Sequence, residues 1–87
     1  MITKTVQVEN PHGIHLRIAA KIVEISKQNQ CRIDFNKNGL KASSRSIMEL
    51  LILEATPKSS LTVTTTGKNE EQTLGAVEML LMDGAGI

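Results

Sequence analysis

Residues 16–28 read Leu-Arg-Ile-Ala-Ala-Lys-Ile-Val-Glu-Ile-Ser-Lys-Gln, and this stretch has the period of an amphipathic helix. Its polar side chains recur every three or four residues and form one exposed stripe: Arg17, Lys21, Glu24 and Gln28. The stripe expected to face a core is made of Ala19, Ile22, Val23 and Ser26. Because strands flank this stretch on both sides, we expect the helix to cross between two strands that run in the same direction.

The flanking segments alternate apolar and polar side chains, which is the pattern of half-buried strands. Asn10-Pro11-His12-Gly13 breaks the chain before the helix, and Asn38-Gly39 is a hairpin signal. The expected strands are residues 2–8, 31–36, 40–42 and 61–66. Each has one apolar and one polar face, so each should lie in a sheet with one face in water.

Two more helices are expected in the second half of the chain. Ser46-Ile47-Met48-Glu49 has the form of a capping box, so a short helix should follow Ser46 and end before Pro57. Gly67 then breaks the chain, Asn69 with Gln72 suggests the cap of a last helix, and Gly84 should close that helix. The predicted order is β-α-β-β-α-β-α.

This order predicts an α+β fold in which a four-stranded antiparallel sheet carries all three helices on one face. The first and second strands run in parallel because the first helix crosses over between them. A strand of opposite direction fits between them, and the fourth strand is the candidate. At 87 residues we expect a single domain, residues 1–87.

Composition excludes several classes of function. Apolar residues make up 40% and charged residues 22%, as in globular proteins, and the net charge of +1 gives no basic field for nucleic acid. One Phe without Trp or Tyr offers no stacking platform and no aromatic cofactor pocket, so no cofactor is expected. No apolar run is long enough to span a bilayer, and the lone Cys31 suits a reducing compartment, so we expect a cytoplasmic protein.

The segment Gly13-Ile14-His15-Leu16-Arg17 is the main candidate site. His15 falls where the loop becomes the first helix, beside N–H groups that have no partner inside the helix and that attract anions. Arg17 can add charge-assisted hydrogen bonds to a phosphate. By spacing alone, His15 could equally be an ordinary polar residue at a helix start, with Arg17 merely solvated.

The wider sequence favours the chemical interpretation. Gly13-Ile14-His15-Leu16-Arg17-Ile18-Ala19-Ala20 resembles the active-site motif Gly-(Ile/Leu)-His-x-Arg-Pro-Ala of the bacterial HPr family, the histidine phosphocarriers of the phosphoenolpyruvate-dependent sugar phosphotransferase system. Ser46-Ile47-Met48 resembles the second motif of that family, which carries a regulatory serine. Gly67 and Asn69 match the break before its last helix, so the resemblance covers essentially the whole chain.

The resemblance implies a function for each motif. His15 would be phosphorylated on Nδ1 by enzyme I, with phosphoenolpyruvate as the ultimate donor, and would pass the group to an A-type component of a sugar permease or to a regulatory relative. Arg17 would contact the phosphoryl group, and Ser46 would be the target of a serine kinase/phosphorylase in lineages that have one. The fold would be the open-faced β-sandwich of that family. The chain would be a phosphoryl relay, not an independent enzyme, and we expect a monomer.

The sequence departs from the family pattern at four positions. Ile18 replaces the usual Pro and keeps an N–H in the first helical turn, so this turn should be less rigid. Glu49, Glu54 and Lys58 stand where glycines are common, and Glu54 should change how the short helix ends.

The short helix is apolar nearly all round, and a helix on a sheet can bury only one side. We therefore predict a docking patch beside His15, made of Leu16, Ala20, Ile47, Met48 and Leu51. Plain core packing is the alternative for each of them. His12 and His15 are three residues apart, but no third ligand is visible, so no metal site is expected.

Ser46 also has a structural explanation as the N-cap of the short helix. Its regulatory role leaves a second hypothesis open, that of an HPr-like binding protein controlled by phosphorylation of Ser46. The presence of His15 argues against this hypothesis, because a purely regulatory protein does not need the nucleophile.

Overall fold

The computed structural model describes residues 1–83, and its elements follow the predicted order. The strands are β1 (Ile2–Gln7), β2 (Cys31–Lys37), β3 (Leu40–Ser43) and β4 (Ser60–Gly67). The helices are α1 (Leu16–Asn29), α2 (Ile47–Ile52) and α3 (Glu70–Asp83). The ends of the strands and of α1 differ from the predicted ends by at most one residue.

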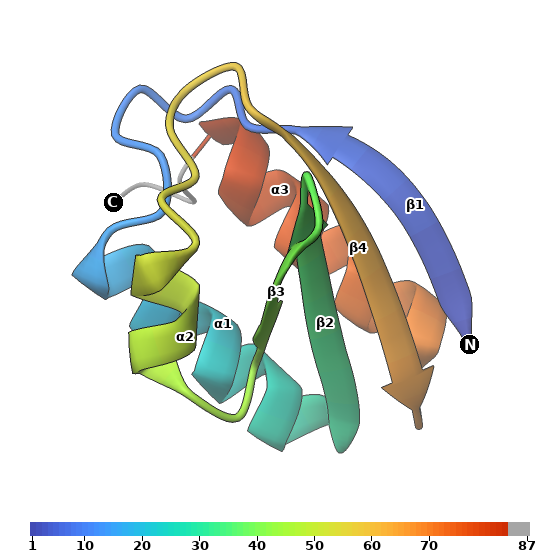
Figure 1. Ribbon diagram of the computed structural model, residues 1–87. Coiled ribbons are helices and arrows are strands. Elements are labelled where there is room, and N and C mark those ends of the chain that lie inside the picture. Colours follow the sequence, from blue (N-terminus) through green and yellow to red (C-terminus); the bar gives the residue numbers. More distant parts are fainter. Residues whose placement is uncertain (84–87) are drawn as a thin grey trace.

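The four strands form one antiparallel sheet in the order β1-β4-β2-β3. β4 therefore lies between β1 and β2, as the crossover by α1 requires. The three helices pack against one face of the sheet and leave the other face open (Figure 1). This arrangement confirms the predicted open-faced sandwich. No helix within residues 1–83 has both the length and the apolar character needed to cross a membrane.

The core lies between the sheet and the helices, and the inward side chains of β2 and β4 form its floor. Its largest fully buried side chains are Phe35, Ile18, Ile22, Ile33, Leu50, Leu53, Leu61, Leu80, Leu81, Val8, Val63 and Val77. The predicted inner stripe of α1 is confirmed for Ala19 and Ile22 but not for Val23 and Ser26. The buried residues of this helix are Ile18, Ala19, Ile22 and Ile25. Val23 and Ser26 lie at the border of the stripe and are partly buried.

A buried hydroxyl pair joins α1 to the sheet. The Ser44 Oγ accepts a hydrogen bond from the Ile33 N–H (3.0 Å) and donates one to the Ser26 Oγ (3.0 Å). The Ser26 hydroxyl in turn donates to the Cys31 carbonyl (2.6 Å). Ser44 directly follows the last residue of β3. Its hydroxyl therefore gives the Ile33 N–H of β2 an acceptor just beyond the point where β3 ends.

The start of α3 differs in detail from the prediction. Asn69 has a positive φ of 54°, and its side-chain amide donates to the Asn29 carbonyl (3.2 Å) instead of capping the helix. Glu70 stabilises the turn instead, because its carboxylate accepts hydrogen bonds from the Gly67 N–H (2.9 Å) and the Met1 ammonium (2.7 Å). The Met1 ammonium, followed by the Gly67 N–H, lowers the pKa of the Glu70 carboxyl below its usual value. The predicted closing residue, Gly84, lies outside the described residues.

Replacing Ser44 by Ala should lower the free energy of unfolding by about 1–3 kcal/mol, because the Ile33 N–H then lies buried without an acceptor. Chemical denaturation measures the change. Ser60→Ala is the matched control, because Ser60 is exposed, and its loss should stay within about 0.5 kcal/mol. Equal losses in the two variants would contradict the role given to Ser44.

Candidate functional site

His15 is the N-cap residue of α1. Its backbone is extended (φ −116°, ψ −176°), as is usual at this position. The Nδ1 atom of its half-buried ring accepts a hydrogen bond from the Arg17 N–H at 3.3 Å. An imidazole thus takes the place of the serine or aspartate oxygen that usually caps a helix. Since Nδ1 accepts this bond, it holds a lone pair, and in the neutral ring the proton is assigned to Nε2.

The helix tip offers several donors around this nitrogen. The first hydrogen bond within α1 runs from the Ala19 N–H to the His15 carbonyl (2.8 Å). The N–H groups of residues 16–18 therefore have no carbonyl partner inside the helix. The first turn of α1 contains no acidic residue. Unpaired N–H groups and the positive end of the helix dipole together attract an anion.

A buried asparagine organises the loop before His15. Asn10 is 1% exposed, and its side-chain amide donates to the Gly13 carbonyl (3.1 Å) while its Oδ1 accepts from the His12 N–H (3.1 Å). The Asn10 N–H donates to the Leu81 carbonyl of α3 (2.9 Å). These bonds fix the turn to the body of the protein. From the sequence alone, this segment is recognisable only as a break in the chain.

Gly13 fits this turn for two reasons. Its φ is +63°, a left-handed value that glycine adopts without penalty. A Cβ atom on Gly13 would also overlap the Ala55 carbonyl oxygen. That oxygen accepts a hydrogen bond from the Ile14 N–H (2.9 Å), so the loop packs against the segment that follows α2 and is hydrogen-bonded to it.

A shallow depression opens beside the ring of His15. It is lined by His12, His15, Leu16 and Arg17. The rings of His12 and His15 meet edge to face, with centroids 5.9 Å apart and an interplanar angle of 83°. Within residues 1–83 no three metal-ligating side chains gather. The depression therefore combines two imidazoles, a guanidinium and a helix tip, which suits a phosphoryl group.

Ser46 caps α2 as predicted. Its Oγ accepts a hydrogen bond from the Glu49 N–H (3.2 Å), and its side chain is half-buried. The return bond of a capping box is absent at Ser46, because the Glu49 carboxylate binds the Ser43 N–H (3.0 Å) instead. The Ser46 N–H donates to the Ser43 carbonyl (3.1 Å).

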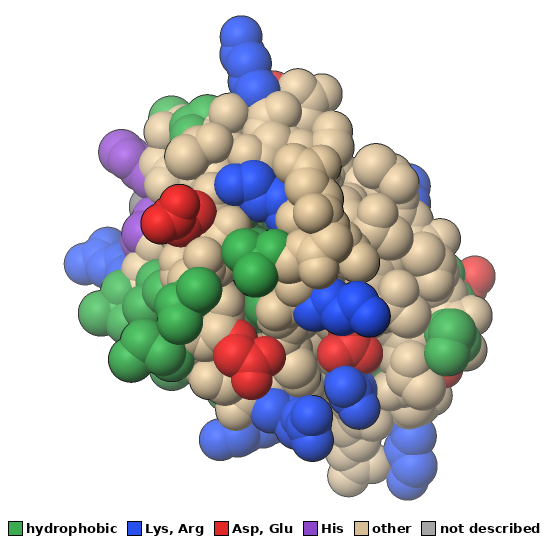
Figure 2. All heavy atoms as spheres, viewed as in Figure 1, with side chains coloured by type: hydrophobic (Ala, Val, Ile, Leu, Met, Phe, Trp, Pro, Cys, Tyr) green, Lys and Arg blue, Asp and Glu red, His purple; other side chains and the backbone are tan. Residues whose placement is uncertain are grey.

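The five residues predicted for docking differ in exposure. Leu16 and Met48 are 62% and 65% exposed, and Ala20 is exposed as well. Ile47 and Leu51 are partly buried and pack against the core. Hydrophobic side chains gather beside the two histidines, over α2 and the start of α1 (Figure 2). Ile52, which was not predicted, is 58% exposed on the same short helix.

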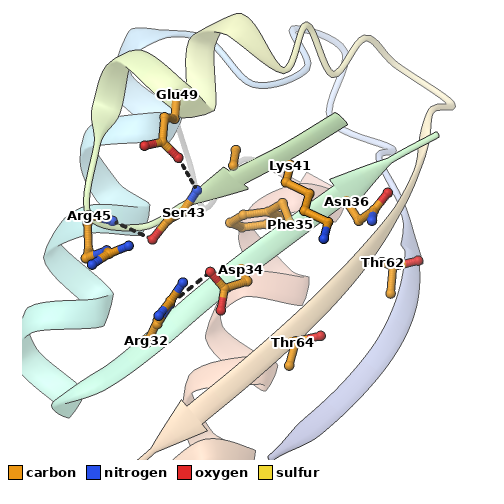
Figure 3. A pocket seen from close by; sticks show the side chains of 11 residues that line it. Arg32, Asp34, Phe35, Asn36, Lys41, Ser43, Arg45, Glu49, Thr62 and Thr64 are labelled. Atoms are coloured by element: carbon orange, nitrogen blue, oxygen red, sulfur yellow. Dashed lines mark hydrogen bonds and ion pairs between the residues drawn. The ribbon is translucent and has the colours of Figure 1, made fainter. Parts of the chain in front are cut away.

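A second hollow lies on the open face of the sheet, apart from the predicted site residues (Figure 3). Its charged groups partly satisfy one another. Arg32 Nε lies 3.0 Å from Asp34 Oδ1, and the Glu49 carboxylate binds the Ser43 N–H. None of the predicted site residues lines this hollow.

Over residues 2–83 the chain matches the family described as "PTS HPr component phosphorylation site". The chain belongs to the HPr family. It is 31% identical over 83 residues to phosphocarrier protein HPr of Treponema pallidum, covering 95% of this chain and 94% of that protein. It is also 31% identical over 84 residues to phosphocarrier protein NPr of Escherichia coli, covering 95% and 93%. The crystal structure of HPr-C-His from Thermoanaerobacter tengcongensis aligns with a TM-score of 0.87 at 25% identity, covering 100% of this chain and 98% of that one.

The departures from the HPr pattern have structural consequences. Ile18 is fully buried, so it contributes to the core where the family usually has a proline. Glu54 and Lys58 have positive φ values of 52° and 71°. At these two positions, where the family often has glycine, the backbone is therefore left-handed although the residue carries a long side chain. Glu49 is helical within α2 and does not need glycine.

Replacing Gly13 by Ala should cost at least about 2 kcal/mol of folding free energy, because the new Cβ meets the Ala55 carbonyl and strains a left-handed residue. Thermal or chemical unfolding measures the loss. Gly75→Ala is the matched control. Gly75 lies in α3 with no atom near its added Cβ, so that variant should gain about 0.5–1 kcal/mol. If Gly13→Ala is as stable as the native chain, the loop does not depend on this contact.

Proposed function

We propose that this HPr-family protein accepts a phosphoryl group on His15 Nδ1 from phosphorylated enzyme I, with phosphoenolpyruvate as the ultimate donor. It then passes the group to A-type components of sugar permeases or to regulatory relatives, and acts as a monomer. The hydrogen bond from the Arg17 N–H to Nδ1 carries the proposal, because it places a nucleophilic lone pair at the tip of α1.

The transfer itself is a displacement at phosphorus. The Nδ1 lone pair forms the new P–N bond while the bond from phosphorus to the donor breaks, and the donor keeps the electron pair. No proton has to leave Nδ1, because the ring proton is on Nε2. Once Nδ1 is phosphorylated, it no longer accepts the Arg17 N–H, and that N–H turns to a phosphoryl oxygen.

The surroundings of Nδ1 support both acceptance and release. The helix tip and the Arg17 guanidinium balance the negative charge of the phosphoryl group. Because Arg17 and the ring edge are exposed, a partner can reach the phosphorus from the solvent side. The chain supplies the nucleophile and the anion site, and the partner supplies the other catalytic groups.

We propose that partners dock on the apolar surface beside His15. Its centre is Leu16, Ala20 and Met48, which are exposed, and Ile47 and Leu51 support it from below. Apolar side chains exposed in a group are typical of protein-binding sites, and the flexible Met48 can adapt to more than one partner.

Ser46 is the proposed regulatory position, for a serine kinase/phosphorylase where the host has one. Its hydroxyl stands at the N-terminus of α2, where a phosphate is electrostatically tolerated. A phosphate there would add negative charge next to Ile47 and Met48. An acidic partner would then dock less well.

Incubation with enzyme I and phosphoenolpyruvate should add one acid-labile phosphoryl group, as measured by intact-protein mass. His15→Ala should add none. Arg17→Ala should still be phosphorylated, with kcat/KM lower by about tenfold, because it loses one charge-assisted contact. Arg32→Ala is the matched control, since Arg32 pairs with Asp34 on the open face of the sheet, and its rate should be unchanged.

Two outcomes of this experiment would contradict the proposal. A phosphoryl group that still appears on His15→Ala would place the acceptor elsewhere. Incorporation that occurs only at Ser46, and only with a serine kinase, would favour the alternative of a regulatory HPr-like protein.

A further inference from the structure

Lys37 is a charged residue at a core-facing position. In β2 the side chains of Cys31, Ile33 and Phe35 alternate with polar ones and are buried. Lys37 continues this inward series at the end of the strand and is partly buried. The apolar stem of Lys37 can lie along the edge of the core while its ammonium group reaches acceptors near the surface.

The acceptors of Lys37 lie where α2 ends. Its Nζ donates to the Glu54 carbonyl oxygen at 2.6 Å and lies 3.4 Å from the Leu53 carbonyl oxygen. These oxygens belong to the C-cap residue Leu53 and to Glu54, which follows it, so they lie just beyond the last turn of the helix. Lys37 thus binds the end of α2 from a distant part of the sequence.

The turn that Lys37 holds has an unfavourable backbone. Glu54 has φ +52°, a value that glycine adopts without penalty and other residues adopt at a cost. Within residues 1–83 the Glu54 side chain forms no hydrogen bond or ion pair that would offset this cost. Two contacts favour the left-handed turn: the hydrogen bond from the Glu54 N–H to the Leu51 carbonyl (3.2 Å) and the bond from Lys37 to the Glu54 carbonyl.

The next residue of this turn supports the loop of His15. The Ala55 carbonyl accepts the Ile14 N–H at 2.9 Å, and the backbone of Gly13 packs directly against it. Ala55 is 3% exposed, so it has little freedom to shift while the turn keeps its conformation. The chain of contacts runs from Lys37 through Glu54 and Ala55 to Ile14, the residue before His15.

We propose that Lys37 is a positioning residue for the phosphoryl-acceptor loop, an inference that rests on the proposed function of His15. Its ammonium group holds the left-handed turn at Glu54, and this turn sets the Ala55 carbonyl on which Gly13 and Ile14 rest. The reactive ring is thereby kept at the tip of α1. Small displacements of a reacting atom can cost up to about a hundredfold in rate.

The test removes the ammonium and keeps the apolar stem. In Lys37→Met the Ile14 amide should exchange its hydrogen about tenfold faster, because its acceptor is no longer fixed. With enzyme I as phosphoryl donor, kcat should fall about tenfold while KM stays within about twofold, because the docking side chains remain in place. Lys41→Met is the matched control. Lys41 is exposed on β3, and both readouts should match the native chain.

Two rescue variants separate positioning from general stability. Glu54→Gly removes the cost of the left-handed turn, so the double variant Lys37→Met/Glu54→Gly should regain native exchange at Ile14 and native kcat to within about twofold. Lys37→Arg keeps the positive charge, so it should retain most of the native protection of the Ile14 amide and most of the native kcat. A loss of overall stability alone would speed the exchange of the other core amides as well, whereas a loss of positioning should be confined to Ile14.

The inference is overturned if Lys37→Met leaves both Ile14 exchange and kcat unchanged, or if Glu54→Gly fails to restore them. If the native chain takes no phosphoryl group from enzyme I, the proposed function fails. In that case the exchange of the Ile14 amide in the same four variants still decides whether Lys37 positions the loop.

Discussion

The hydrogen bond between the Arg17 N–H and His15 Nδ1 is the interaction on which the proposed phosphoryl transfer depends. A helix tip attracts anions, and an N-cap side chain lies where the N–H groups converge. When the cap is an imidazole, the same nitrogen that satisfies the helix is also a nucleophile. In the proposed function the phosphoryl group would take over the Arg17 N–H that the imidazole binds now, so neither state would leave that donor without a partner.

The rest of the molecule holds that tip in place. The loop before His15 is bound to α3 through the Asn10 N–H and the Leu81 carbonyl, and to the segment after α2 through Ile14 and Ala55. These two anchors join the start of α1 to α3 and to the segment after α2, and both helices lie on the same face of the sheet (Figure 1). The sheet contributes no atom to the depression beside His15, yet its strand order decides which segments meet there.

Local patterns were enough to predict most of the fold. Alternation placed the strands, and Ser46 and Asn38-Gly39 marked a helix start and a hairpin. Contacts between distant segments could not be read in this way. Three such contacts follow only from the packed structure: the hydrogen bonds of Asn10, the packing of Gly13 against Ala55, and the hydrogen bond from Lys37 to Glu54. The border of the α1 stripe was misplaced for a similar reason, because the packing of the helix on the sheet decides that Ile25 is buried and Val23 is only partly buried. The charge of Lys37 on an otherwise apolar strand face is a signal of this contact that the sequence carries.

We propose that Nδ1 at the helix tip, and not another nitrogen, receives the phosphoryl group. Nuclear magnetic resonance of the nitrogen-labelled protein, recorded before and after incubation with enzyme I and phosphoenolpyruvate, distinguishes the two ring nitrogens. We expect phosphorus coupling at Nδ1 of His15, a proton retained on Nε2, and a large shift of the Arg17 amide as its acceptor changes from nitrogen to a phosphoryl oxygen. Phosphorylation on Nε2, or an Arg17 amide that does not move, would rule out transfer at the helix tip.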